Sequence, residues 1–329
     1  MKIYDTIPEQ VNLGPIEFLK WLGEPSIITA GTEGPAIVMS CLIHGNEPSG
    51  FYAIHNLLKE LYKEDFLKKK IYFIFVNIRA ALQEPHFTKR HCDDESDMNR
   101  IWGNPGVSGK QNKDAEDIMG FLETKDLKLV LDFHNTTGDN PVFAITTALD
   151  AKNLGMCSFF CIVVFHKPGM KTFIEWSKKM CTSISVECGR NNIGQSHKNA
   201  EEVLIKTLVI AGAMDGKVEA KTSLKLAYDP TLVETITEDI AFSEINTGED
   251  LVLRPDLDKL NMITIPKGTH IGWQNKEGSI THPVLSTTDK KITTNQDCTF
   301  SMMTTVVDVI KKDTLGYVVK TKELQLSKL

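Results

Sequence analysis

Apolar runs suited to strands alternate with helical patterns from Ala36 to about Met214. Short runs rich in Val, Ile and Phe predict buried strands, and apolar residues spaced three to four apart predict amphipathic helices. The expected strands are Ala36–Leu42, Ile71–Val76, Leu129–Phe133, Cys161–Phe165 and Ser183–Val186, and the expected helices are Ser49–Leu61, Asp114–Glu123 and Asn199–Met214. This alternation predicts an α/β fold, a sheet joined by crossover helices.

The pattern changes after Lys217, where short strand-like runs are separated by Gly, Pro and Asn. We therefore expect two domains. Residues 1–215 would form the α/β domain with the chemistry, and residues 216–329 a smaller β-rich domain that walls one side of the active site.

The segment HGNEPSG follows the first of these strands and opens a helical pattern, so His44 and Glu47 lie at a strand-to-helix corner. Positions three apart share a face of the first helical turn, and an imidazole nitrogen with a carboxylate oxygen suits zinc. The small residues Gly45 and Gly50 allow close backbone approach. By itself the pair is more typical of a helix-capping carboxylate beside a surface histidine.

A third ligand is predicted in LVLDFHNTTG, where the apolar strand Leu129–Phe133 leads into His134 and a run of small polar residues. Ligands that converge at the carboxyl ends of neighbouring strands have this form. Asp132 is placed to orient an imidazole from behind. Two nitrogens and one carboxylate would leave one position of a tetrahedral zinc ion open, which is typical of catalytic sites.

A base is predicted at Glu187, which follows the alternating run Ser183–Val186. A carboxylate there could take a proton from water and pass it to a leaving amine. The charged segment TKRHCDDESDMNR contributes Arg90, Asn99 and Arg100, which are suited to binding carboxylates or an oxyanion. A solvated polar loop is the alternative for this segment when it is considered alone.

These motifs together resemble a known family. HGNE, NIRA at Asn77–Ala80, DMNR at Asp97–Arg100, DFHNTTG and VECG occur in the order found in succinylglutamate desuccinylases and aspartoacylases, which are zinc carboxypeptidase-like enzymes. The resemblance implies a mixed sheet flanked by helices and one zinc ion per chain. Family roles map residue by residue: zinc ligands on His44, Glu47 and His134, base and acid on Glu187, oxyanion contact on Arg90, and substrate carboxylate contacts on Asn99 and Arg100.

The chain departs from the aspartoacylase pattern in two places. Those enzymes carry an arginine about ten residues before the catalytic glutamate, which holds a second substrate carboxylate; here Ser177 stands there, with Lys178 beside it as a substitute cation. They also carry a tyrosine after a Cys-Thr pair, where this chain has Phe300. N-acetylaspartate is therefore expected to be a poor substrate, because a lysine replaces a guanidinium fork badly.

The composition limits the class of protein. A net charge of −6 argues against nucleic-acid binding, and no apolar run approaches the length of a membrane span. Seven cysteines without a CxxC motif, together with an N-terminus lacking an apolar signal region, predict a cytoplasmic protein with free thiols. The residues Ser327-Lys328-Leu329 also match a peroxisomal address.

The sequence thus predicts a zinc-dependent amidohydrolase that cleaves a small anionic N-acylated amino acid. The enzyme could form a homo-oligomer. Two alternatives use the same scaffold. One is a zinc carboxypeptidase acting on peptide C-termini; the other is a zinc-binding or small-molecule-binding protein without activity.

Overall fold

A computed structural model of the chain describes residues 1–32, 34–104 and 108–326. The matched address Ser327–Leu329 lies outside these residues. The chain divides into two compact units. The first comprises the described residues of 1–135, 142–224 and 324–329, and the second comprises 136–141 and 225–323.

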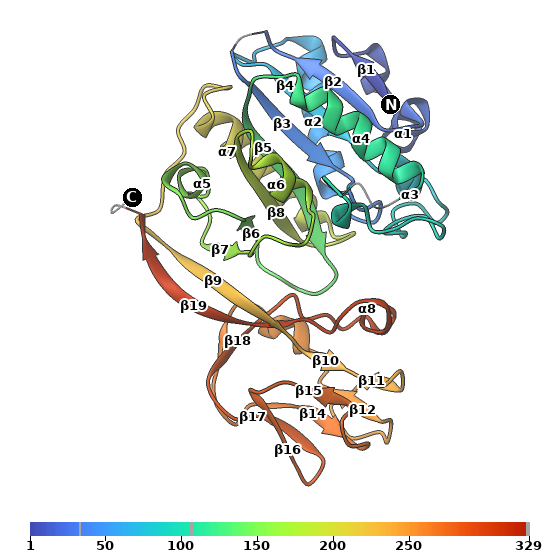
Figure 1. Cartoon of the computed structure of the whole chain (residues 1–329), viewed down its shortest axis with the longest axis vertical. Coiled ribbons are helices and arrows are strands. Elements are labelled where there is room, and N and C mark those ends of the chain that lie inside the picture. Colours follow the sequence, from blue (N-terminus) through green and yellow to red (C-terminus); the bar gives the residue numbers. More distant parts are fainter. Residues whose placement is uncertain (33, 105–107, 327–329) are drawn as a thin grey trace. The chain divides into compact units, whose positions relative to one another are not determined.

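The first unit contains a sheet with helices packed against it (Figure 1). Its strands are β1 (Lys2–Tyr4), β2 (Ser26–Ala30), β3 (Ala36–Cys41), β4 (Ile71–Phe75), β5 (Leu127–Thr136), β6 (Phe143–Thr146), β7 (Ile162–Phe165) and β8 (Thr182–Arg190). Its helices are α1 (Pro15–Leu22), α2 (Ser49–Lys63), α3 (Ile78–Ala81), α4 (Lys110–Glu123), α5 (Ala151–Met156), α6 (Phe173–Ser177) and α7 (Gly194–Ile210), with the 3-10 turns η1 (Glu9–Asn12) and η2 (Met98–Arg100).

The strand order in this unit is β1-β2-β4-β3-β5-β8-β6-β7. Strand β3 pairs in parallel with β4 and β5, whereas β2 is antiparallel to β4 and β6 is antiparallel to β8. The sheet is therefore mixed, as predicted. Crossover connections through α2 and α4 make the parallel pairs possible, because a tight turn cannot join parallel strands.

Both faces of the central strands are covered, which explains their nearly continuous apolar runs. On one face, Val38 and Val130 pack in a core cluster with Ile118 of α4 and Trp176 of α6. On the other face, α2 contacts β3 and α7, and α7 contacts β8. A Cβ on Gly50 of α2 would lie 2.2 Å from Cβ of Phe133, so the helix can approach β5 only with glycine at this position.

The expected helix Asn199–Met214 starts earlier and ends earlier than predicted. Helix α7 spans Gly194–Ile210, and its N-cap is Ile193. Asn199 lies inside the helix, where its side-chain amide donates to the carbonyl of Cys188 at 2.9 Å. The predicted start at Asn199 was therefore wrong by five residues, and this side chain joins the interior of the helix to β8.

The second unit is rich in short strands, as expected. Its elements are β9 (Ser223–Leu232, which begins at the end of the first unit), β10 (Glu234–Thr235), β11 (Ile240–Phe242), β12 (Leu251–Leu253), β13 (Thr264–Ile265), β14 (His270–Gln274), β15 (Ile280–Thr281), β16 (Leu285–Thr288), β17 (Lys291–Thr294), β18 (Cys298–Ser301), β19 (Tyr317–Gln325), η3 (Leu257–Leu260) and α8 (Val307–Lys312). Strands β11-β12-β14-β17-β16 form one sheet around a core that includes Leu253, Ile271 and Ile292.

The division into units differs from the proposed boundary after residue 215. Residues beyond α7 remain in the first unit, where the amide of Lys68 donates to the carbonyl of Ala213 and the amide of Lys221 to that of Ser158. Residues 136–141 belong to the second unit, because the amide of Asp139 donates to the carboxylate of Asp258 at 3.1 Å. The separate roles proposed for the two parts remain predictions.

None of the helices among the described residues combines the length and the apolar character needed to cross a bilayer.

Candidate metal centre

His44 and Glu47 lie in the turn that connects β3 to α2. Their backbone is held against neighbouring segments: the amide of Gly45 donates to the carbonyl of Arg90, and a Cβ on Gly45 would lie 2.5 Å from the amide nitrogen of Ala81. Glycine is therefore required at this position. Nδ1 of His44 lies 2.9 Å from Oε1 of Glu47, and both side chains are buried.

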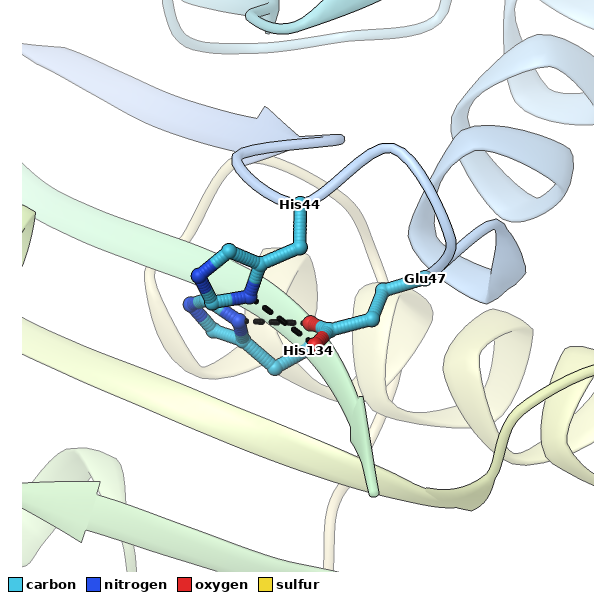
Figure 2. Close-up of side chains that lie close together, drawn as sticks. All are labelled: His44, Glu47 and His134. Carbon is cyan, nitrogen blue, oxygen red and sulfur yellow. Dashed lines mark hydrogen bonds and ion pairs between the residues drawn. The ribbon is translucent and has the colours of Figure 1, made fainter. Parts of the chain in front are cut away.

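His134 comes from the neighbouring strand β5, which continues to Thr136 rather than ending at Phe133 as predicted. Its Nδ1 lies 2.8 Å from Oε2 of Glu47, and the amide of Asn135 donates to the same oxygen at 3.2 Å. The two imidazoles thus face one carboxylate, one on each oxygen (Figure 2). The sequence placed all three side chains together, and the structure does so as well.

Each imidazole is also held from behind by an aspartate. Nε2 of His134 lies 2.6 Å from Asp132, as the sequence suggested, and Nε2 of His44 lies 3.0 Å from Asp97. The hydroxyl of Ser40 donates to the other oxygen of Asp132 at 2.6 Å. Asp97 was not predicted in this role, although it opens the DMNR motif. Carboxylates behind histidines fix the ring orientation and are typical of metal sites.

These three side chains could hold a metal ion. One ligand atom from each of His44, Glu47 and His134 lies within 4.8 Å of the others. The Nδ1 atoms of both histidines face Glu47, whereas each Nε2 is hydrogen-bonded to an aspartate. The available metal donors are therefore two imidazole nitrogens and a carboxylate. That set suits zinc or a similar first-row ion better than calcium or magnesium, which prefer oxygen.

The charges in the cluster depend on one another. Burial opposes ionisation of Glu47, but the two imidazoles outweigh it and hold the pKa of Glu47 well below its usual range. Burial also disfavours a charged His134, yet Asp132 and Glu47 together raise the pKa of that imidazole well above its usual value. A metal ion that binds here must displace a proton from an imidazole, so its affinity should fall as the pH falls.

Glu187 lies on β8, opposite Phe143 of β6, and is buried. Its Oε2 has no hydrogen-bond partner in the described part of the chain, and Glu187 is not one of the three clustered side chains. Burial raises the pKa of Glu187 to about 7, and the charges of His134, Glu47, His44 and Arg90 also act on it. A carboxyl group poised near neutral pH beside the cluster can exchange protons with a reacting group.

The shifted pKa of Glu187 predicts how stability depends on pH in the metal-free protein. Below about pH 4.5, the usual value, the side chain is protonated in both states. Between 4.5 and about 7 the unfolded chain loses a proton that the folded protein keeps, so stability falls as the pH rises. We expect Glu187→Gln to remove this loss, worth about 3 kcal/mol above pH 7. Urea unfolding of both proteins from pH 4 to 8 checks this, and a constant difference between them would contradict it.

Arg90 lies beside the cluster with about a third of its side chain exposed. Its guanidinium donates to Asp97 through Nε at 3.2 Å and Nη2 at 2.9 Å, and Nη1 lies 3.4 Å from Oε1 of Glu47. Asp97 therefore holds His44 with one oxygen and Arg90 with the other. The arginine is fixed in direction but still accessible, as a group that binds an anion must be.

Asn99 and Arg100 differ in how they are held. Asn99 is buried, and its side-chain oxygen accepts the amide of Phe173 at 2.9 Å, so part of the side chain ties η2 to α6. Arg100 is 40% exposed; its Nη1 donates to the carbonyl of Asn99 at 2.9 Å and lies 4.0 Å from Asp97. Their proposed contacts with a substrate carboxylate remain predictions.

Comparison with known proteins agrees with this geometry. Residues 33–158 match the succinylglutamate desuccinylase/aspartoacylase catalytic domain. The match includes the three clustered residues, Arg90, Asn99 and Arg100. This segment, rather than the whole chain, is therefore assigned to the succinylglutamate desuccinylase/aspartoacylase catalytic domain. A search of curated proteins found no match.

Solved structures share the fold at low identity. A succinylglutamate desuccinylase/aspartoacylase from Rhodobacter sphaeroides has a TM-score of 0.60 and 14% identity, with 91% of this chain and 88% of that chain covered. Murine aminoacylase 3 has a TM-score of 0.61 and 14% identity, with 90% and 98% covered. The product-bound ectoine utilization protein EutE (DoeB) from Ruegeria pomeroyi has a TM-score of 0.59 and 17% identity, with 84% and 81% covered.

The structure shows where Ser177 and Lys178 lie, the residues at which the chain departs from the aspartoacylase pattern. Ser177 is fully buried at the end of α6, where its hydroxyl donates to the hydroxyl of Ser183 at 2.9 Å. It fills a buried position. Lys178 is exposed and lines a cavity of about 430 Å³ with Trp102, Lys171 and Trp176, and none of the clustered residues lines that cavity. A substrate contact for Lys178 remains a prediction.

Proposed function

We propose that this protein is a zinc-dependent hydrolase that cleaves the amide bond of a small N-acylated amino acid. One observation carries the proposal: two histidines turn Nδ1 toward the two oxygens of Glu47 while each Nε2 rests on an aspartate. Imidazoles that direct one nitrogen to a shared point and hold the other on a carboxylate are typical of metal sites. The match of residues 33–158 to a catalytic domain named for two deacylation activities supports the proposed reaction class.

The proposed roles follow from burial and charge. A zinc ion bound by His44, Glu47 and His134 would act as a Lewis acid toward water and the acyl carbonyl. Glu187 takes a proton from the attacking water, whose oxygen joins the acyl carbon. As the carbon–nitrogen bond breaks, Glu187 returns that proton to the departing amine. The raised pKa of Glu187 suits both transfers near neutral pH.

The remaining roles concern anions. Arg90 is placed to stabilise the negative oxygen that develops on the acyl carbonyl, because its guanidinium is fixed by Asp97 and remains partly exposed. Asn99 and Arg100 are proposed to bind the carboxylate of the amino acid, and Lys178 to offer a further cation. The assignment of the substrate as a small anion, the possible homo-oligomer and the cytoplasmic location also remain proposals.

The proposal is tested by incubating zinc-loaded protein with N-acetyl, N-succinyl and N-formyl amino acids and with peptides while freed amine is measured. Release from acylated amino acids but not from peptides supports it. Release of C-terminal residues from unacylated peptides would instead support a zinc carboxypeptidase. Zinc binding without any release would support a binding protein on the same scaffold.

N-acetylaspartate is expected to be a weak substrate. Position 177 carries a serine, buried against Ser183, in place of an arginine, and the exposed Lys178 is a poorer partner for a second carboxylate. The measurement is kcat/KM for N-acetylaspartate against N-acetyl amino acids with neutral side chains. A tenfold preference for aspartate, about 1.4 kcal/mol, would show that another cation binds its side chain. Lys178→Ala would then show whether that cation is Lys178.

A further inference from the structure

Arg79 bridges two carboxylates from different parts of the first unit. It lies on the short helix α3, directly after β4, in the NIRA motif. Its Nη2 donates to Glu95 at 2.5 Å, and its Nη1 donates to Asp114 of α4 at 2.7 Å. The side chains of Arg79, Glu95 and Asp114 are only 20%, 6% and 10% exposed. One guanidinium thus ties α3, α4 and the loop that contains Glu95 to one another.

The charges make this contact strong. Burial disfavours a charged arginine, but the two carboxylates outweigh it and raise the pKa of Arg79. A guanidinium presents donors in a fixed fork, so it also sets the direction of each carboxylate. With little water nearby, loss of the guanidinium would leave Glu95 buried beside Asp114 without its cation, and the loop would have to move to hydrate it.

The loop that Arg79 holds is the one that supports the metal cluster. Asp97 follows Glu95 by two residues. One oxygen of Asp97 lies 3.0 Å from Nε2 of His44 and accepts the amide of Asn99 at 2.8 Å. The other accepts Nη2 of Arg90 at 2.9 Å. Two residues span at most about 7 Å, so the position of Glu95 restricts where Asp97 can lie.

We propose that Arg79 is a positioning residue for the cluster. By fixing Glu95, it holds Asp97 where it can orient the imidazole of His44 and the guanidinium of Arg90 together. The inference rests on the proposed metal site for its consequence, but the loop geometry can be measured without metal. The competing explanation is that the Arg79 group is an ordinary buried ion pair that contributes only to stability.

The test compares Arg79→Met, Glu95→Ala and the double variant with wild type. A matched control is Arg254→Met in the second unit, which removes a paired arginine donating to Asp256 through Nε at 2.6 Å and Nη2 at 2.9 Å. Three quantities are measured: the zinc dissociation constant by chelator competition, hydrogen exchange of the Asn99 amide in the metal-free protein, and the unfolding temperature.

We expect Arg79→Met to weaken zinc binding about tenfold or more, as loss of an outer-sphere partner does, and to speed exchange at Asn99. Glu95→Ala should do the same, and the double variant should bind zinc no more weakly than either single one, since all three remove the same contact between Arg79 and Glu95. Arg254→Met should lower the unfolding temperature while both other quantities stay unchanged.

Unchanged zinc binding and unchanged Asn99 exchange in a folded Arg79→Met or Glu95→Ala protein would overturn the inference. If Arg79→Met does not fold, Glu95→Ala carries the test, because Glu95 lies in the loop and not in a helix or strand. Failure of the wild type to bind zinc would overturn the proposed function alone. In that case, exchange at Asn99 in the metal-free variants still decides whether Arg79 holds the loop.

Discussion

Replacement of His134 with alanine is expected to abolish stoichiometric zinc binding and, with it, hydrolysis. The variant removes one of two nitrogens that face Glu47, and it leaves Asp132 buried without its imidazole. Loss of outer-sphere partners alone weakens metal binding by about 10-fold to 100-fold, so loss of a direct ligand should exceed roughly 100-fold. His44→Ala should also lose stoichiometric zinc, because the imidazoles of His44 and His134 each lie against one oxygen of Glu47.

The measurement is metal content after dialysis, together with amine release before and after zinc is added back. His282→Ala serves as a control, since that histidine pairs with Thr231 in the second unit. The ligand assignment would be wrong if the double variant His44→Ala, His134→Ala kept one zinc ion per chain.

Replacement of Glu187 with glutamine is expected to leave zinc binding near wild type and to lower kcat about a hundredfold or more, the usual cost of losing a general base. Glutamine keeps the shape of the side chain but cannot accept and return a proton. Because Glu187 is not among the clustered ligands, the metal should be retained. This separates the loss of a base from the loss of a ligand.

Glu84→Gln is a suitable control, since that side chain is 78% exposed and its carboxylate lies 3.1 Å from Nε2 of His86. Zinc content, kcat and KM are measured for both variants. If Glu187→Gln turned over substrate within a few-fold of wild type, another group would have to be the base.

Much of the architecture could be predicted from local patterns. The strands β3 and β4 and the helix α2 were predicted to within two residues at each end, because both faces of the strands are buried and the helix has one apolar face. The early elements β1, β2 and α1 were not predicted, and neither was β6. These elements span only three to eight residues, which is too short to show a clear period.

The sequence by itself determined which side chains form the cluster, since His44, Glu47 and His134 were identified from their residue types and their places beside strands. Only the tertiary structure decided what stands around them. It placed Asp97 behind His44, buried Ser177 against Ser183, and brought Arg79 to Glu95 and Asp114. Local periodicity reports which face of an element is buried, whereas contacts between distant residues and the pKa of a buried carboxylate depend on how complete elements pack.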